Sequence, residues 1–129
     1  MQLAILVTAA PGTPMGDHAL PFCQAAASQG HHIVRIFFYG EGVYHASGLR
    51  TPPQDERDDL PGWKILADQG IELCVCIAAA LRRGVLSREE AERHQRLGHS
   101  LAPGFVLGGL GLLAEAYQLS NHRLHFGQP

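Results

Sequence analysis

Three cysteines, Cys23, Cys74 and Cys76, are the residues of this sequence with the most distinctive chemistry. An odd number of cysteines in an otherwise cysteine-poor chain is not the pattern of a secreted disulfide framework. The sequence therefore predicts free thiols in a cytoplasmic protein. A thiol reacts as its thiolate, so the functional cysteine should lie where the surrounding structure favours that form.

Cys76 lies at the junction of a predicted strand and a predicted helix. Residues 71–77 are aliphatic and strand-like, whereas residues 78–83 favour a helix that stops at Gly84. In open parallel sheets, reactive groups gather where strands end and helix N-termini begin. The helix dipole, Arg82 and Arg83 would favour a thiolate at this position. Position alone leaves a buried structural cysteine equally possible, because free cysteines are often buried.

The other two cysteines are better explained by packing. Cys74 lies two residues before Cys76 on the same strand, so it should point to the same face and lie deeper in the sheet. A role for Cys74 as a second thiol stays open. Cys23 lies in the first predicted helix. The Cys74–Cys76 spacing differs from zinc and thioredoxin-like motifs, and the histidines show no ligand pattern, so we predict neither a metal nor a cofactor.

Two glycine-containing segments approximate ligand-binding motifs. Residues 109–114 resemble a dinucleotide fingerprint, but no acidic residue follows Glu115, so we interpret Gly109 and Gly111 as allowing a helix to pack closely on the sheet. The turn-like segment Pro11–Gly16 leaves open a flavodoxin-like binder of a small anionic ligand. Arg88, Arg93 and Arg96, by contrast, are typical of a solvated helix surface.

The elements that must position these residues alternate along the chain. Predicted strands cover residues 3–7, 32–39, 71–77, 105–107 and 123–126. Predicted helices start at Asp17 or Pro21 and end at Ser28, cover residues 63–69, 78–83 and 109–119, and begin again at a Ser87–Glu90 capping box. This order predicts an α/β fold with three α/β/α layers and a mainly parallel five-stranded sheet.

Length and composition set outer bounds on the function. The 129 residues fit one domain, residues 1–129, and 46% hydrophobic with 17% charged residues is an ordinary globular composition. A net charge of -2 gives no electrostatic reason to bind nucleic acid or an anionic membrane. The apolar N-terminal run is too short to span a bilayer, so we expect neither a signal peptide nor an anchor.

Taken together, four segments resemble the DsrE/TusD family of sulfurtransferases. They occur in the family's order and cover nearly the whole chain: Phe37–Val43, Thr51–Glu56, Cys76–Gly84, and Gly109–Gly111 with Ala114–Ala116. The Cys-x-Ala-Ala-Ala-x-Arg-Arg-Gly stretch is the most specific. Its cysteine is the family's persulfide site, which the resemblance carries over to Cys76, with Arg82 and Arg83 stabilising the persulfide or docking a partner. The resemblance also implies a DsrE-like, flavodoxin-like topology.

The resemblance further implies a sulfur relay. A TusA-like protein donates sulfur, a TusE-like protein accepts it, and the sulfur reaches 2-thiouridine at tRNA wobble positions without direct nucleic-acid binding. Two alternatives stay open: a DsrE-like carrier in dissimilatory sulfur oxidation, which passes sulfur to a DsrC-type protein, and a non-catalytic partner subunit.

The resemblance also implies that the chain assembles with other subunits. Family members of this kind work with TusB-like and TusC-like subunits, and we expect a homo-oligomer when the chain is alone. The Phe37–Tyr39 segment, together with Val43 and Tyr44, would supply apolar contact surface for this assembly.

Overall fold

A single five-stranded sheet forms the centre of the molecule, as the computed structural model of residues 1–127 shows. Its strands are β1 (Gln2–Val7), β2 (His32–Phe38), β3 (Leu73–Cys76), β4 (Phe105–Gly108) and β5 (His122–Phe126). They lie in the order β4-β3-β2-β1-β5, and every neighbouring pair is parallel. The predicted parallel five-stranded α/β sheet is therefore confirmed. Gln128 and Pro129, which the predicted domain includes, lie outside the described residues.

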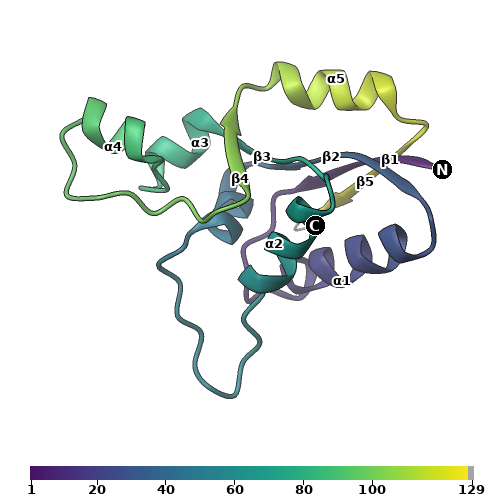
Figure 1. Cartoon of the computed structure of the whole chain (residues 1–129), viewed down its shortest axis with the longest axis horizontal. Coiled ribbons are helices and arrows are strands. Elements are labelled where there is room, and N and C mark those ends of the chain that lie inside the picture. Colours follow the sequence, from purple (N-terminus) through teal and green to yellow (C-terminus); the bar gives the residue numbers. More distant parts are fainter. Residues whose placement is uncertain (128–129) are drawn as a thin grey trace.

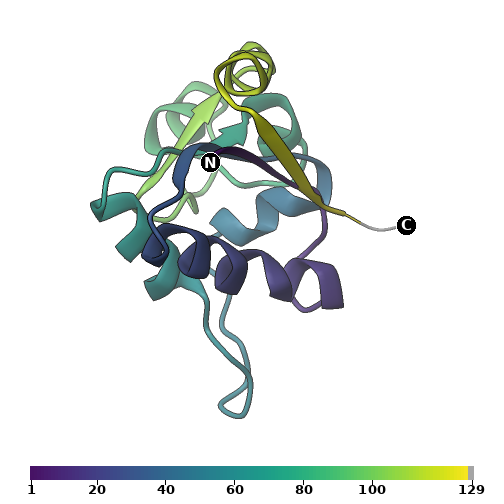
Figure 2. The ribbon, with the colours of Figure 1, turned by 90° about the vertical axis from the view of Figure 1, so that its right-hand side faces the viewer.

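Helices cover both faces of the sheet and so form three layers (Figures 1 and 2). Helices α1 (Pro14–Ser28) and α2 (Leu60–Asp68) lie on one face, and α5 (Gly111–Leu119) lies on the other. The remaining helices are short and lie beyond the ends of β2 and β3: the 3-10 helix η1 (Gly40–Ala46), α3 (Ile77–Arg82) and α4 (Arg88–Arg93). The candidate cysteine therefore lies in the part of the molecule where short helices cluster.

An aromatic cluster holds η1 and α2 against the sheet. The rings of Phe38 and Trp63 meet edge to face with centroids 5.2 Å apart, and Phe105 approaches Phe38 at 5.4 Å. His45 of η1 completes the cluster, 5.9 Å from Trp63. All but Phe105 are fully buried in this cluster, so the end of β2 is rigidly packed.

Helix α1 begins earlier than predicted, at Pro14 rather than at Asp17 or Pro21. The Thr13 hydroxyl caps the helix by accepting a hydrogen bond from the Gly16 amide at 3.2 Å, and Pro14 occupies the first turn, where proline is favoured. Pro21 lies inside the helix and has no N–H for the Asp17 carbonyl. Arg57 supplies the missing donor from the loop before α2, with Nη2 2.7 Å from that carbonyl oxygen.

The predicted capping box at the start of α4 is half formed. Ser87 Oγ accepts a hydrogen bond from the Glu90 amide at 3.2 Å, as predicted. The Glu90 carboxylate turns the other way, because it contacts Arg93 at 3.0 Å and His94 at 3.3 Å. The predicted start of this helix is therefore confirmed. The predicted reciprocal hydrogen bond from the Ser87 amide to the Glu90 carboxylate is wrong.

Candidate functional site

Cys76 lies where three elements meet at the carboxyl edge of the sheet. It is the last residue of β3 and the N-cap residue of α3, and its register partner in β4 is Gly108. On the other side, η1 contacts both β3 and α3. The predicted position of Cys76, at a strand end and directly before a helix, is confirmed.

All three cysteines are free and buried, and Cys76 is the least buried of them. Cys76 is 4% exposed, whereas Cys23 and Cys74 are 0% exposed. Burial raises the pKa of Cys23 to about 12. Burial, with a smaller contribution from the Glu72 charge, raises the pKa of Cys74 to about 11. Burial therefore disfavours the thiolate form of Cys23 and Cys74, which agrees with their interpretation as core residues.

Close packing of α5 on the sheet depends on Gly108 rather than on the glycines that the sequence indicated. A Cβ atom at Gly108 would lie 2.5 Å from Leu112 Cδ1 and 2.8 Å from Cys74 Sγ. At Gly109 and Gly111, the same atom would meet nothing within 4 Å. The packing role predicted for those two glycines was therefore wrong, and it belongs to the residue just before them.

The two arginines after Cys76 have different surroundings. Arg83 forms an ion pair with Glu41 of η1 at 2.7 Å and donates to the Ala79 carbonyl at 3.1 Å. Arg82 is exposed and has no ion-pair partner within residues 1–127. Among the described hydrogen bonds, none joins Arg82 or Arg83 to the Cys76 sulfur. Arg83 thus ties α3 to η1, and Glu41, 42 positions away, was missed because no local spacing indicates such a pair.

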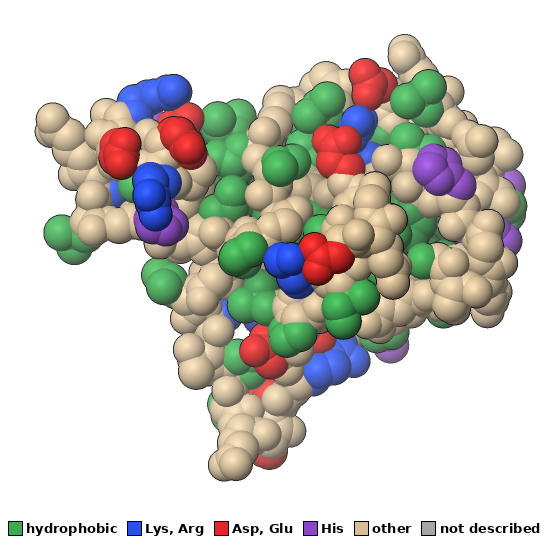
Figure 3. Space-filling view, in the orientation of Figure 1, with side chains coloured by type: hydrophobic (Ala, Val, Ile, Leu, Met, Phe, Trp, Pro, Cys, Tyr) green, Lys and Arg blue, Asp and Glu red, His purple; other side chains and the backbone are tan. Residues whose placement is uncertain are grey.

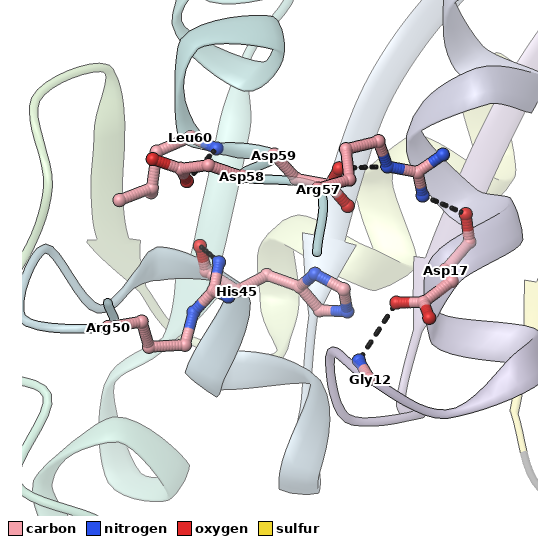
Figure 4. A network of polar contacts seen from close by, with 8 residues as sticks. All are labelled: Gly12, Asp17, His45, Arg50, Arg57, Asp58, Asp59 and Leu60. Atoms are coloured by element: carbon pink, nitrogen blue, oxygen red, sulfur yellow. Dashed lines mark hydrogen bonds and ion pairs between the residues drawn. The ribbon is translucent and has the colours of Figure 1, made fainter. Parts of the chain in front are cut away.

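Backbone amides of the Pro11–Gly16 segment donate hydrogen bonds to acceptors of the chain itself, as Figure 4 shows for Gly12. The Gly12 amide donates to an Asp17 carboxylate oxygen at 2.8 Å, and the Thr13 amide donates to the Ala10 carbonyl at 3.3 Å. These are amides that a bound anion would need. The negative charge of Asp17 already lies there, which counts against the small-anion alternative.

His45 is fully buried, whereas the other seven histidines are exposed or half-buried. Its Nε2 lies 3.0 Å from the Ala9 carbonyl oxygen, and Nδ1 has no partner among the described residues. Burial is the main cause that lowers the pKa of His45, the hydrogen bond to Ala9 and the Asp17 charge oppose it, the Arg50 charge adds to it, and the net pKa is about 4. Figure 4 shows the imidazole between Arg50, in the loop after η1, and the turn at Gly12. His45 is therefore neutral at physiological pH.

The predicted apolar contact surface is not on the outside of the molecule. Phe37, Phe38 and Val43 are fully buried, and of the aromatic strand end only Tyr39 is substantially exposed, at 39%. Green side chains are visible in several places on the face shown in Figure 3. Large apolar side chains that are exposed outside this segment include Leu49, Ile65, Leu97, Val106, Leu110 and Leu119. Phe37, Phe38 and Val43 therefore belong to the core, and Tyr39 and the half-buried Tyr44 are the members of the predicted surface that solvent reaches.

Residues 1–127 lack two further features that would point to a function. No group of three or more histidine, cysteine, aspartate or glutamate residues in this part of the chain is arranged to hold a metal ion. Within the same residues, no helix is both long and apolar enough to cross a membrane.

Comparison with known proteins connects this geometry to a family. The DsrE/DsrF-like family matches residues 1–126. The chain is 44% identical over 128 residues to Sulfurtransferase TusD of Enterobacter sp. (strain 638), covering 98% of this chain and 100% of that one. Sulfurtransferase TusD of Klebsiella pneumoniae subsp. pneumoniae matches at the same identity and coverage, and that of Yersinia pestis at 44% and 98% of both chains.

Solved structures share the fold. The crystal structure of the ychN protein from E. coli superposes with a TM-score of 0.74 at 22% identity, over 97% of this chain and 99% of that one. MTH1491 of Methanobacterium thermoautotrophicum, a protein of unknown function, superposes with a TM-score of 0.58 at 12% identity, over 95% and 97%. The chain thus belongs to the DsrE/DsrF-like family, in its DsrE/TusD group. Within that group it is a sulfur-relay sulfurtransferase.

Proposed function

We propose that Cys76 carries the relayed sulfur as a persulfide. The observation that carries this proposal is the position of Cys76 at the end of β3 and the start of α3, inside the family-like Cys-x-Ala-Ala-Ala-x-Arg-Arg-Gly stretch. Cys23 and Cys74 are fully buried, and burial raises the pKa of both thiols. Cys76 is therefore the cysteine best suited to react with another protein.

The transfer is a thiol–persulfide exchange with no net oxidation. The Cys76 thiolate attacks the outer sulfur of a donor's cysteine persulfide, so a new S–S bond forms at Cys76 while the donor's S–S bond breaks. The donor leaves as a thiolate and takes up a proton. In the second step an acceptor thiolate attacks the outer sulfur on Cys76, and Cys76 leaves as the thiolate that started the cycle.

Access to Cys76 must increase during this exchange, because the residue is only 4% exposed. The ion pair between Arg83 and Glu41 joins the two elements beside Cys76, and the glutamate is 61% exposed. Such a pair contributes little stability and opens readily, roughly 0–1 kcal/mol. Arg83 thus positions α3 against η1, and the exposed Arg82 attracts a partner or stabilises the persulfide.

The relay that fits best is the tRNA branch, in the cytoplasm. The curated relatives carry the name TusD, which supports a TusA-like donor, a TusE-like acceptor and 2-thiouridine at tRNA wobble positions as the destination. The chain would act as one domain beside TusB-like and TusC-like subunits. Three free thiols in the chain suit a reducing compartment.

Three single cysteine variants test this proposal. Cys76→Ser should abolish sulfur transfer from a persulfurated TusA-like donor to a TusE-like acceptor. Cys74→Ser and Cys23→Ser serve as matched controls and should keep transfer within about twofold, since neither thiol ionises near neutral pH. Undiminished transfer by Cys76→Ser would refute the assignment, and loss of transfer in Cys74→Ser with an intact fold would move it to Cys74.

A further inference from the structure

A groove with a volume of about 680 Å³ lies beside the end of α3 that is distant from Cys76. We call it the leucine groove, because its apolar lining comes from Leu49, Leu81, Leu86 and Leu97. It opens between the α4 region and the long loop that connects η1 to α2, where Figure 3 shows a notch in the surface. The groove is separate from the aromatic core around Trp63.

Two of the leucines at this groove are exposed to an unusual degree. Leu97 is fully exposed, and Leu49 is 74% exposed. Large aliphatic side chains that line a concave surface but stay exposed to solvent are typical of surfaces that a partner covers. The apolar rim therefore indicates an interaction surface rather than part of the core.

The floor of the groove is held in place by the buried residue Ser100. Its hydroxyl donates to the Gly84 carbonyl at 2.7 Å and accepts from the Leu86 amide at 3.1 Å. Its carbonyl accepts from the Gly48 amide at 2.6 Å. Three segments that are distant in the sequence thus meet at one residue, so the groove is formed before any partner arrives.

The polar lining of the groove lacks acidic residues. Among its ten lining residues there is no aspartate or glutamate, while Arg96, His94 and His99 are all present. Arg96 has no carboxylate partner within residues 1–127, since the described ion pairs of α4 involve Arg93 and His94. His94 already faces Glu90 at 3.3 Å, so Arg96 is the positive charge at the groove that no carboxylate within residues 1–127 pairs with.

The length of α3 sets the scale of the separation between Cys76 and the groove. Leu81 lies five residues after Cys76, which at 1.5 Å per helical residue is roughly 8 Å along α3. An extended chain covers about 3.3 Å per residue, so two to three residues span that distance.

We propose that the leucine groove binds a short segment of the protein that exchanges sulfur with Cys76. In that segment a large apolar side chain is flanked by carboxylates, and it lies about two to three residues from the partner's sulfur-carrying cysteine. The apolar side chain packs between Leu49, Leu81 and Leu97, and the carboxylates face Arg96. The identity of the partner rests on the proposed function, whereas the preference for an acidic, apolar segment rests on the groove alone.

The test is a nuclear magnetic resonance titration of the full chain with two synthetic peptides. The first has the sequence Glu-Leu-Asp-Phe-Glu, and the matched control is Lys-Leu-Lys-Phe-Lys, both with blocked ends. The acidic peptide should shift the backbone amides of residues 84–86 and 97–101 saturably and bind about tenfold more tightly than the basic one, or about 1.4 kcal/mol. Absent shifts at millimolar peptide, or equal affinity for both peptides, would overturn the proposal.

Variants of the chain separate the groove from general charge and from sulfur chemistry. Leu97→Ser and Arg96→Glu should each weaken binding of the acidic peptide by about fivefold or more. Arg88→Glu changes the net charge equally, but Arg88 does not line the groove, so binding should fall less than twofold. A loss in Arg88→Glu equal to that in Arg96→Glu would overturn the proposal in favour of a diffuse charge effect.

Two further outcomes distinguish this proposal from the one it rests on. Cys76→Ser should bind the acidic peptide as the wild type does, and excess peptide should slow sulfur loading of the wild type by a persulfurated donor. If Cys76 takes no sulfur while the peptide binds as described, the proposed function fails and the groove's specificity stands. Sedimentation tests whether the groove instead joins two copies of the chain. If Leu97→Ser abolishes self-association and the acidic peptide does not, the groove is an interface between copies and the proposal is wrong.

Discussion

Acidification should destabilise this protein through one buried histidine, His45. Its pKa is about 4 in the folded chain and 6.5 when unfolded, so between these values the unfolded state binds more protons. Stability from the neutral imidazole is fully present above pH 6.5 and is lost progressively as the pH falls toward 4. One pKa unit corresponds to about 1.36 kcal/mol, so the full loss is roughly 3 kcal/mol, and about 2 kcal/mol is lost by pH 5.

The assay is urea unfolding at about pH 7.5 and about pH 5, for the wild type and for His45→Gln. Glutamine keeps a side-chain N–H near the Ala9 carbonyl but does not titrate. Other titrating groups contribute equally to both proteins, so the difference between the two pH dependences isolates His45. We expect the free energy of unfolding of the wild type to fall by about 2 kcal/mol more than that of the variant. Parallel pH dependences would refute the reasoning, because they would mean that His45 is protonated equally in both states.

Three other variants test contacts described above. Gly108→Ala should lower the free energy of unfolding by about 1–3 kcal/mol, because the new Cβ overlaps Leu112 and Cys74, whereas Gly109→Ala should change it by less than about 0.5 kcal/mol in the same denaturant assay. Arg57→Ala should lower the free energy of unfolding by about 1–3 kcal/mol, measured by thermal unfolding. Adding Pro21→Ala should recover part of this loss, because it restores a helical N–H for the Asp17 carbonyl. No recovery would contradict this explanation of the interior proline. Glu41→Gln should speed alkylation of Cys76 by iodoacetamide several-fold, because it weakens the ion pair with Arg83. As a control, Asp68→Asn breaks the distant ion pair with Lys64 and should leave the rate unchanged. Equal rates in both variants would mean that the Arg83–Glu41 pair does not restrict access to Cys76.

The sequence was sufficient to predict the sheet and the position of Cys76, because both depend on local patterns. Aliphatic runs of strand length, followed by helix-favouring segments, determine where β3 ends and α3 begins. The start of α1 was missed because two prolines competed for the first turn. The deciding contact comes from Arg57, which is 40 positions away from Asp17 and has no local signature.

Burial near the site was harder to predict, since it depends on tertiary packing. The sequence around His45 has no apolar periodicity, yet η1 turns the imidazole into the aromatic cluster with Phe38 and Trp63. The same packing buries Phe37 and Val43, which the sequence had placed on a contact surface for other subunits. Exposed leucines such as Leu97 become informative only when the fold brings them together around a groove.

The most direct measurement of the central claim is to locate the transferred sulfur. The wild-type chain is incubated with a donor persulfurated with isotopically labelled sulfur, the persulfides are blocked by alkylation, and the peptides are analysed by mass spectrometry. We expect label on the peptide that contains Cys76. Because Cys74 lies on the same peptide, fragmentation between the two residues makes the assignment. Label mainly on Cys74 or Cys23, or label that persists in Cys76→Ser, would show that Cys76 is not the sulfur carrier.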